Sequence, residues 1–374
     1  MLSPTQKYGV VPQSQLEGVV QVKEDTDLQM FKTIHKGDFV ISLRSFQGGF
    51  EYSLYEGVCS PAYQVFYPIT PICDLYYRYL FKSQSFISKM NNLTVGIREG
   101  KNIQYIDFAN SQIPVPPIAE QERIAAFLDA ECAEIDAVLE KTRASIEEYK
   151  KLKQAVITQA VTKGVRGDRP MKDSGIEWIG EIPAEWGVVP HKRIMHKVKE
   201  ICEQYNGEDI ISLTVNGVVK RDLTAGGKMP TSFDGYQYVE PNNLLLCLFD
   251  IDVTPRCVGV VRDYGVTSPA YSRFVMHDGY YNAYYDYLLR MIDDNKVFVH
   301  LSKNLRSSLT ESDFGAIKTC APPLAEQKCI AAFLDVRCDE IDALIAKKQQ
   351  YLTEIENYKK SLIYEYVTGK KEVV

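Results

Sequence analysis

The sequence predicts an α+β protein of two similar halves, in which two globular domains are joined by a pair of long helices. The motif Pro-Pro-x-Ala-Glu-Gln occurs at residues 116–121 and again at residues 322–327, and 322 minus 116 gives an offset of 206 positions. A heptad pattern follows each copy, and strand-like runs between Gly- and Pro-bearing turns precede each copy. The offset far exceeds the unit of a solenoid, so we interpret the chain as two copies of one large unit.

The segments that follow the motif are predicted to be central helices at residues 116–164 and 321–374. Each opens after a Pro pair with a Glu in its first turn, and each pattern stops near a glycine, Gly164 or Gly369. Apolar residues recur in steps of three and four, which is typical of a coiled-coil seam. The residues expected to pack the helix pair are Leu128, Ile135, Leu139, Ile146, Tyr149 and Val156 in the first helix, and Leu334, Ile341, Ile345, Leu352, Ile355 and Leu362 in the second.

A long helix with an apolar stripe on one side needs that stripe covered, so the two helices are expected to pack on each other. We expect an antiparallel, coiled-coil-like pair with pseudo-twofold symmetry, because each helix then carries one domain. In that arrangement the equivalent residues Cys132 and Cys338 lie far apart and form no disulfide. The alternative is that each seam faces the core of a separate domain.

The two domains are expected at residues 1–115 and at residues 165–320, the second range including a linker. Between the shared points the residues differ most in the turns, where Arg44–Gly49 in the first domain corresponds to Phe249–Thr254 in the second. Two similar scaffolds with different loops suit a protein that recognises two different targets. The shared points include Ser-Pro-Ala-Tyr at 60–63 and 268–271, Tyr-Tyr at 76–77 and 284–285, and Asp-Phe at 107–108 and 313–314.

The composition is that of an ordinary globular protein, with 45% hydrophobic and 25% charged residues. Nine scattered cysteines without a C-x-x-C pair favour free thiols in a reducing cytoplasm. The longest apolar run, Leu244–Phe249, is too short to span a bilayer, and residues 1–7 have no apolar signal core. We therefore expect a cytoplasmic location without a membrane partner.

The duplicated motif, the Phe-Leu-Asp at 127–129 and 333–335, and the linker Asp173–Pro183 together resemble the specificity (S) subunit of type I restriction-modification systems. The resemblance covers nearly the whole chain. It implies two target-recognition domains, each reading one half of a split, asymmetric site on double-stranded DNA. It also implies that the central helices set the spacer between the half-sites.

The same resemblance implies partners that carry out the chemistry. Two methyltransferase (M) subunits are expected to dock on the chain and to methylate adenine, and two restriction/translocase (R) subunits are expected to complete the nuclease. S-adenosylmethionine, ATP and Mg²⁺ are then expected on those partners, and none of them on this chain.

The sequence departs from the expected pattern in one place. The second half contains about 40 residues, from Val165 to about Asp209, that have no counterpart in the first half as it is given from Met1. We therefore expect either that the first recognition domain lacks its opening segment or that the true start lies further upstream. In the first case the family resemblance implies that self-association is one way to complete the domain.

The chain has none of the sequence motifs that its expected partners need for catalysis. It contains no Asn-Pro-Pro-Tyr-like motif for a target adenine, no Gly-rich cofactor loop after a strand, and no phosphate-binding loop for ATP. The five histidines lack metal-ligand spacing, so no metal site is expected. We expect a non-catalytic recognition subunit.

Basic and amide residues in turns are the candidates for DNA contact, because phosphates bind Lys and Arg while Arg, Asn and Gln read base edges. For each of them an ordinary solvated surface position remains the alternative. The candidates are Lys7, Tyr8, Arg44, Gln47, Arg98, Lys101 and Asn102 in the first domain, and Lys220, Arg221, Arg256, Arg273, Lys303, Asn304 and Arg306 in the second.

A different function is also open at this point. A coiled-coil scaffold whose globular ends bind other proteins would fit the net charge of −6 and the lack of a dense basic stripe. DNA footprinting in the presence of the methyltransferase distinguishes the two, since only a specificity subunit protects two short patches of DNA.

Overall fold

The computed structural model describes residues 1–6, 8–17, 29–41, 50–93, 103, 105–215, 217–224, 230–254, 257–302 and 307–373. Its longest elements are helices α4 (Ile118–Lys163) and α8 (Leu324–Val367), each of which begins directly after a Pro pair. Gly164 follows α4 with φ +76°, a left-handed conformation that glycine adopts readily at a helix end. The two predicted helices are therefore confirmed. The bounds of α4 lie within two residues of the expected ones, whereas α8 begins three residues later and ends seven residues earlier than expected.

The chain divides into two compact units. Unit 1 comprises residues 1–145 and 348–374, and unit 2 comprises residues 146–347. Each unit thus contains one globular domain and part of each long helix. The domain boundaries expected from sequence lie at the helix ends, whereas the compact units divide both helices near their middles.

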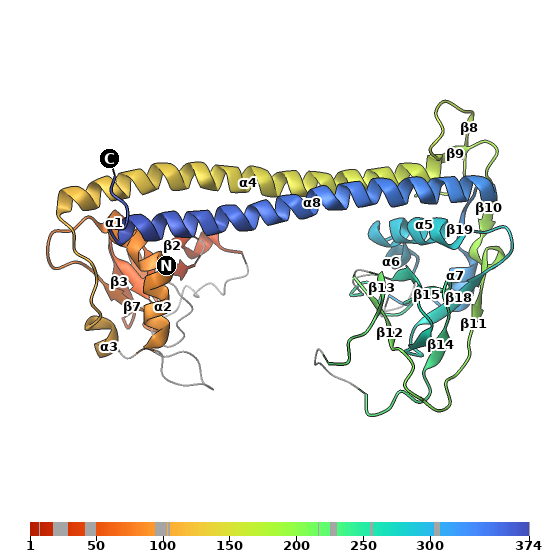
Figure 1. Cartoon of the computed structure of the whole chain (residues 1–374), viewed down its shortest axis with the longest axis horizontal. Coiled ribbons are helices and arrows are strands. Elements are labelled where there is room, and N and C mark those ends of the chain that lie inside the picture. Colours follow the sequence, from red (N-terminus) through yellow and green to blue (C-terminus); the bar gives the residue numbers. More distant parts are fainter. Residues whose placement is uncertain are drawn as a thin grey trace. The chain divides into compact units, whose positions relative to one another are not determined.

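Unit 1 contains short helices and small antiparallel sheets (Figure 1). Its strands pair as β1–β2, as β3–β6, and as a three-stranded sheet in the order β5-β4-β7. Its main apolar core lies between the three-stranded sheet, the short helices and the long helices. The elements are β1 (Leu2–Thr5), β2 (Gly9–Pro12), η1 (Gln13–Gln15), β3 (Lys32–Ile34), β4 (Phe39–Ile41), β5 (Phe50–Tyr52), β6 (Gly57–Cys59), β7 (Gln64–Phe66), α1 (Asp74–Lys82), α2 (Gln84–Asn92) and α3 (Tyr105–Ala109).

Unit 2 repeats this plan and adds strands before it. Its central sheet has four strands in the order β11-β18-β15-β16, and the pairs β12–β13 and β14–β17 correspond to β1–β2 and β3–β6 of unit 1. Two further pairs are β8–β9 and β10–β19. The elements are β8 (Met171–Asp173), β9 (Glu181–Pro183), β10 (Gly187–Pro190), η2 (His191–Arg193), β11 (Met195–Val198), β12 (Ile211–Thr214), β13 (Gly217–Lys220), β14 (Gln237–Val239), β15 (Leu244–Leu246), β16 (Val258–Val260), β17 (Gly265–Thr267), β18 (Ser272–Met276), α5 (Asn282–Asp294), α6 (Val297–Leu301), α7 (Glu311–Ala316) and β19 (Lys318–Ala321).

Within each unit α4 and α8 lie side by side and run antiparallel, as predicted (Figure 1). In unit 1 Lys359 on α8 binds Asp136 on α4 at 2.6 Å, and in unit 2 Lys153 on α4 binds Asp342 on α8 at 2.6 Å. Asp136 and Asp342 are equivalent in the repeat, and so are Lys153 and Lys359. Each unit therefore forms the same ion pair, with α4 and α8 in exchanged roles. All twelve residues expected to pack the helix pair are buried or half-buried.

Each domain is attached to the long helices by the same hydrogen bonds. The Tyr76 hydroxyl donates to the Val367 carbonyl in unit 1, and the Tyr284 hydroxyl donates to the Val161 carbonyl in unit 2, both at 2.8 Å. Burial raises the pKa of both phenols, so each remains a protonated donor. The side-chain oxygens of Gln121 and Gln327 accept equivalent backbone N–H groups at 2.8 and 2.7 Å. Equivalent positions of the internal repeat therefore hold each domain on the helix pair.

Unit 2 has one further attachment. Glu326 in the first turn of α8 accepts from the Arg169 guanidinium at 2.6 Å and from the Trp186 indole N–H at 2.9 Å. The side chains of Glu326 and Trp186 are buried, and Arg169 lies over the Trp186 ring at 5.3 Å. The linker is thus anchored by a buried ion pair. Glu120, the repeat equivalent of Glu326, is half-buried, and the described residues of unit 1 supply no ion pair to it.

None of the helices in the described ranges is long and apolar enough to cross a membrane.

Candidate nucleic-acid interface

Two hairpins with a similar closure occupy equivalent places in the two units. In the β1–β2 hairpin the Thr5 hydroxyl donates to the Gly9 carbonyl at 3.1 Å, and in the β12–β13 hairpin the Thr214 hydroxyl donates to the Gly217 carbonyl at 2.9 Å. Gly9 and Gly217 both have a positive φ, +73° and +98°. The Thr-to-Gly closure is shared, whereas the tips differ in sequence and in length, with three residues between Thr5 and Gly9 and two between Thr214 and Gly217.

The described candidates in the hairpins are accessible. Tyr8 lies at the tip of the β1–β2 turn with 59% of its surface exposed. Lys220 ends β13 and forms an exposed ion pair with Asp209 at 2.7 Å. Exposed pairs of this kind contribute little stability, so the Lys220 ammonium is able to exchange Asp209 for a phosphate. Lys220 and the half-buried Arg221 line a shallow cavity of about 490 Å³.

Arg273 was expected to contact DNA, but the structure buries it. It belongs to β18, and only 3% of its surface is exposed. Its guanidinium donates to the Asn243 side-chain oxygen at 2.6 Å and to the Tyr238 carbonyl at 2.8 Å. Glu200 and Glu240 lie at 3.6 and 3.4 Å. We therefore assign Arg273 a structural role, because a buried and fully engaged cation is not available to DNA.

The other candidates lie outside the described residues, so their part in DNA contact stays a prediction. They are Lys7, Arg44, Gln47, Arg98, Lys101, Asn102, Arg256, Lys303, Asn304 and Arg306.

The structure adds a basic strip that the sequence reasoning missed. Lys192, Arg193, His196 and Lys197 are exposed on η2 and β11, at the edge of the four-stranded sheet. The His196 ring stacks on the His277 ring at 4.7 Å, and Lys197 lies 3.4 Å from Glu311. The signal in the sequence is the run of basic residues between 191 and 199. Such a strip suits contact with a phosphate backbone.

His191 in the same segment is buried and does not belong to the basic strip. Its ring lies 4.6 Å from the Phe314 ring. Burial lowers the pKa of His191 to about 4, and the backbone at Phe314 opposes this only in part. The imidazole is therefore neutral in the folded protein at neutral pH.

We expect the stability of unit 2 to fall by about 2 kcal/mol between pH 7 and pH 5 because of His191. Below pH 6.5 the unfolded chain takes up a proton that the folded unit, with its lowered pKa, takes up only near pH 4. Urea unfolding followed by tryptophan fluorescence reports unit 2, since both tryptophans, Trp178 and Trp186, lie in it. His191→Phe should remove this part of the pH dependence, while the exposed His300→Gln should keep it. An unchanged pH dependence in His191→Phe would refute the assignment.

The described residues show no arrangement typical of a metal centre. Among them no group of three or more His, Cys, Asp and Glu residues is placed to hold a metal ion. All nine cysteines are free thiols, and burial raises the pKa of Cys320 to about 11, which keeps it protonated.

Comparison with known proteins identifies relatives of this chain. Residues 3–148 match the family model of the type I restriction modification DNA specificity domain. The chain is 26% identical over 326 residues to the type I restriction enzyme MjaVIII specificity subunit of Methanocaldococcus jannaschii, covering 80% of this chain and 71% of that protein. It is also 26% identical over 282 residues to the putative type I restriction enzyme MjaX specificity subunit of the same organism, covering 73% of this chain and 62% of that protein.

The fold is found among solved structures. One such structure is of a chain from work on the structural basis of complex assembly and conformational transition of the type I R-M system. The TM-score is 0.68 at 17% sequence identity, and the match covers 90% of this chain and 83% of the other.

Proposed function

We infer that this chain, a relative of the type I restriction-modification specificity subunits, is itself a specificity subunit that reads DNA sequence for a restriction-modification complex. The family match over residues 3–148 and the two related specificity subunits support this function. The observation that carries it is the duplicated frame. Two hairpins with the same Thr-to-Gly closure, Thr5 to Gly9 and Thr214 to Gly217, present different residues at their tips.

We propose that each unit reads one half of a bipartite, asymmetric site. Different side chains on equivalent turns read different base edges, because specificity depends on the donors and acceptors that reach the groove. Lys220 and the basic strip of Lys192, Arg193, His196 and Lys197 supply phosphate contacts in unit 2, which position the protein without reading sequence. The continuous helices α4 and α8, shared by both units, set the spacer.

We further propose that the chain is non-catalytic and directs partner subunits. Two methyltransferase subunits would bind S-adenosylmethionine and methylate adenine, and two restriction/translocase subunits would use ATP and Mg²⁺. The exposed faces of α4 and α8 carry apolar residues that suit docking of a partner, including Val138, Leu152, Val336 and Leu344.

Two matched variants test whether each unit reads a different half-site. Arg306→Ala is expected to weaken recognition of one half-site by about ten- to a hundredfold, since a base-reading arginine contributes about 1–3 kcal/mol. Arg44→Ala is expected to do the same to the other half-site. Sequencing of methylated adenines in a host that carries the chain and its methyltransferase measures relaxation at each half. Equal relaxation at both halves in either variant would show that the assignment is wrong.

A further inference from the structure

In unit 1 a lysine attaches the turn of the β1–β2 hairpin to helix α1. The Lys82 ammonium donates to the main-chain carbonyl of Gln6 at 3.2 Å and to the Glu51 carboxylate at 2.6 Å. Gln6 and Tyr8 belong to the turn of this hairpin, and Tyr8 has 59% of its surface exposed. Lys82 thus holds the turn by its backbone, whatever side chains the turn carries.

The partner of Lys82 is a buried carboxylate. Only 3% of Glu51 is exposed, whereas the Lys82 side chain keeps 29% exposure. Burial raises the pKa of Glu51, and the Lys82 ammonium beside it acts in the opposite direction. A buried carboxylate that loses its cation is strongly destabilised. Glu51 therefore keeps the Lys82 ammonium at a fixed place beside the turn.

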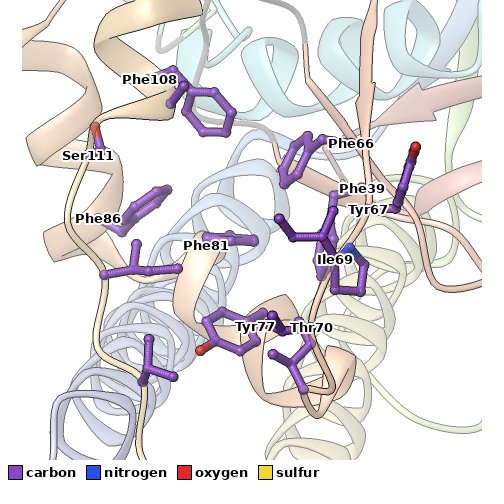
Figure 2. Close-up of a pocket in the computed structure, with 15 residues that line it drawn as sticks. Phe39, Phe66, Tyr67, Ile69, Thr70, Tyr77, Phe81, Phe86, Phe108 and Ser111 are labelled. Carbon is purple, nitrogen blue, oxygen red and sulfur yellow. The ribbon is translucent and has the colours of Figure 1, made fainter.

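The charged pair stands on a rigid aromatic frame. Phe81, which directly precedes Lys82, packs at 5.4 Å against Phe50 of β5. Figure 2 shows Phe81 beside Phe66 and Phe86 in the lining of an apolar cavity, with ring centroids 5.9 and 5.1 Å away. A group on packed secondary structure is placed more precisely than a group on a loop. Strand β5 and helix α1 therefore hold the pair in one place.

The end of α1 is also fixed. Lys82 is the last residue of this helix, and helix ends fray when nothing holds them. The buried Ser83 hydroxyl donates to the Leu80 carbonyl at 2.6 Å and accepts from the Phe86 N–H at 3.4 Å. The bond from Lys82 to the turn therefore starts from an ordered helix end.

A cavity of about 410 Å³ lies next to the turn. Gln6 and Tyr8 line it together with Lys82 and with Lys359 of α8. Leu2, at the base of the hairpin, is buried, so the base is packed against the domain. On the side of the cavity the turn faces open space. The distance between turn and domain is therefore set there by the Lys82 hydrogen bond rather than by side-chain packing.

Unit 2 holds its hairpin in another way. By the strand register Gly259 of β16 is the repeat equivalent of Glu51. A Cβ at Gly259 would lie 2.8 Å from Val218 Cγ2, so the β12–β13 hairpin packs directly on the strand and leaves no room for a carboxylate. Arg290, the equivalent of Lys82, pairs with a carboxylate of its own helix. The two hairpins are therefore supported differently, which suits a protein that reads two unlike half-sites.

We propose that Lys82 is a positioning residue of unit 1, which fixes the turn of the β1–β2 hairpin in the conformation that reads its half-site. The inference rests on the proposed function, because it concerns a hairpin that reads bases. A turn that is already ordered loses less conformational entropy on binding and presents its donors and acceptors at one place. Without the bond from Lys82 the turn would adopt several positions and accept wrong bases more readily.

Methylation by the full chain assembled with its methyltransferase tests the role of Lys82. Initial rates are compared between a duplex with the site found by sequencing of methylated adenines and duplexes with one base pair changed in either half. In Lys82→Met the preference for the native duplex should fall about three- to tenfold for changes in one half, since a hydrogen bond from a charged donor is lost. The preference at the other half should stay within about twofold, because distant sites act independently.

Three further variants separate positioning from stability. Glu51→Gln combined with Lys82→Met leaves no unpaired buried charge, and should relax the same half to the same extent because the bond to the Gln6 carbonyl is still lost. Lys82→Arg keeps a charged donor and should retain the native preference. Lys89→Met removes another lysine of unit 1, which donates to the Gln112 carbonyl at 2.6 Å, and should retain it as well.

The two halves of the site distinguish the outcomes. Relaxation of one half in Lys82→Met and in the double variant supports the positioning role. Equal loss at both halves would indicate a phosphate contact or a general loss of folding and would overturn the proposal, as would a native preference in the double variant. An unchanged preference in Lys82→Met, with a native chain that reads a bipartite site, refutes the positioning role alone. A native chain that methylates without sequence preference would refute the proposed function, and this inference with it.

Discussion

Replacement of Glu326 by leucine is expected to destabilise unit 2 by about 3–5 kcal/mol. The change leaves the Arg169 guanidinium buried without its carboxylate and removes the acceptor of the Trp186 indole N–H. A buried cation without its partner costs far more than the net contribution of the pair, because its desolvation is no longer compensated. Arg169 also contacts Glu185 at 3.0 Å, which is half-exposed and compensates only in part.

The internal repeat supplies the matched control. Glu120→Leu changes the equivalent position of unit 1, where the described residues form no ion pair, and should shift stability by no more than about 0.5 kcal/mol. Urea unfolding followed by tryptophan fluorescence measures unit 2, and circular dichroism follows the whole chain. If Glu326→Leu unfolds at the same urea concentration as the native chain, Glu326 does not anchor the linker.

The long helices were predictable because their signal is local and repeated. The Pro pair, the acidic first turn and the heptad seam all lie within α4 and α8, and the seam residues such as Leu128 and Leu334 are buried as expected. The antiparallel direction followed from the repeat, and the ion pairs of Asp136 with Lys359 and of Asp342 with Lys153 confirm it.

Whether a single charged residue is buried or exposed was less predictable, because this depends on contacts with residues distant in sequence. Arginine is usually exposed, yet Arg273 is enclosed by Asn243, which directly precedes β15, and by the Tyr238 carbonyl of β14. Its repeat equivalent, Val65, is apolar, which was a signal for an inward position. The basic strip was missed for the same reason, since His196 and Lys197 are placed at a sheet edge by the pairing of β11 with the distant strand β18.

Lengthening both long helices by one heptad is expected to reduce methylation at the original site at least about a hundredfold. The insertions belong after Ala144 and after Gln350, so that the ion pairs of Lys359 with Asp136 and of Lys153 with Asp342 keep their register. Seven residues add about 10 Å of helix, roughly the rise of three base pairs. Once one unit engages its half-site, the other then meets mismatched base pairs, each costing about 1–3 kcal/mol.

The control keeps the helix lengths and changes only the residues. The same heptad, with its apolar residues at the places of Ile146 and Tyr149 and of Leu352 and Ile355, is substituted for residues 145–151 and 351–357. The substitution keeps the seam and loses the exposed pairs of Arg143 with Glu356 and of Lys150 with Glu147. This variant should methylate the original site as the native chain does, within about threefold.

The most direct measurement is therefore genome-wide sequencing of methylated adenines with the native and the lengthened chains, each expressed with the methyltransferase. We expect the native chain to yield two unlike half-sites at one constant spacing. The lengthened chain should yield the same two half-sites at another spacing, or no sites. Methylation of the original spacer by the lengthened chain, or a single uninterrupted site for the native chain, would contradict a protein that reads two half-sites at a separation set by its helices.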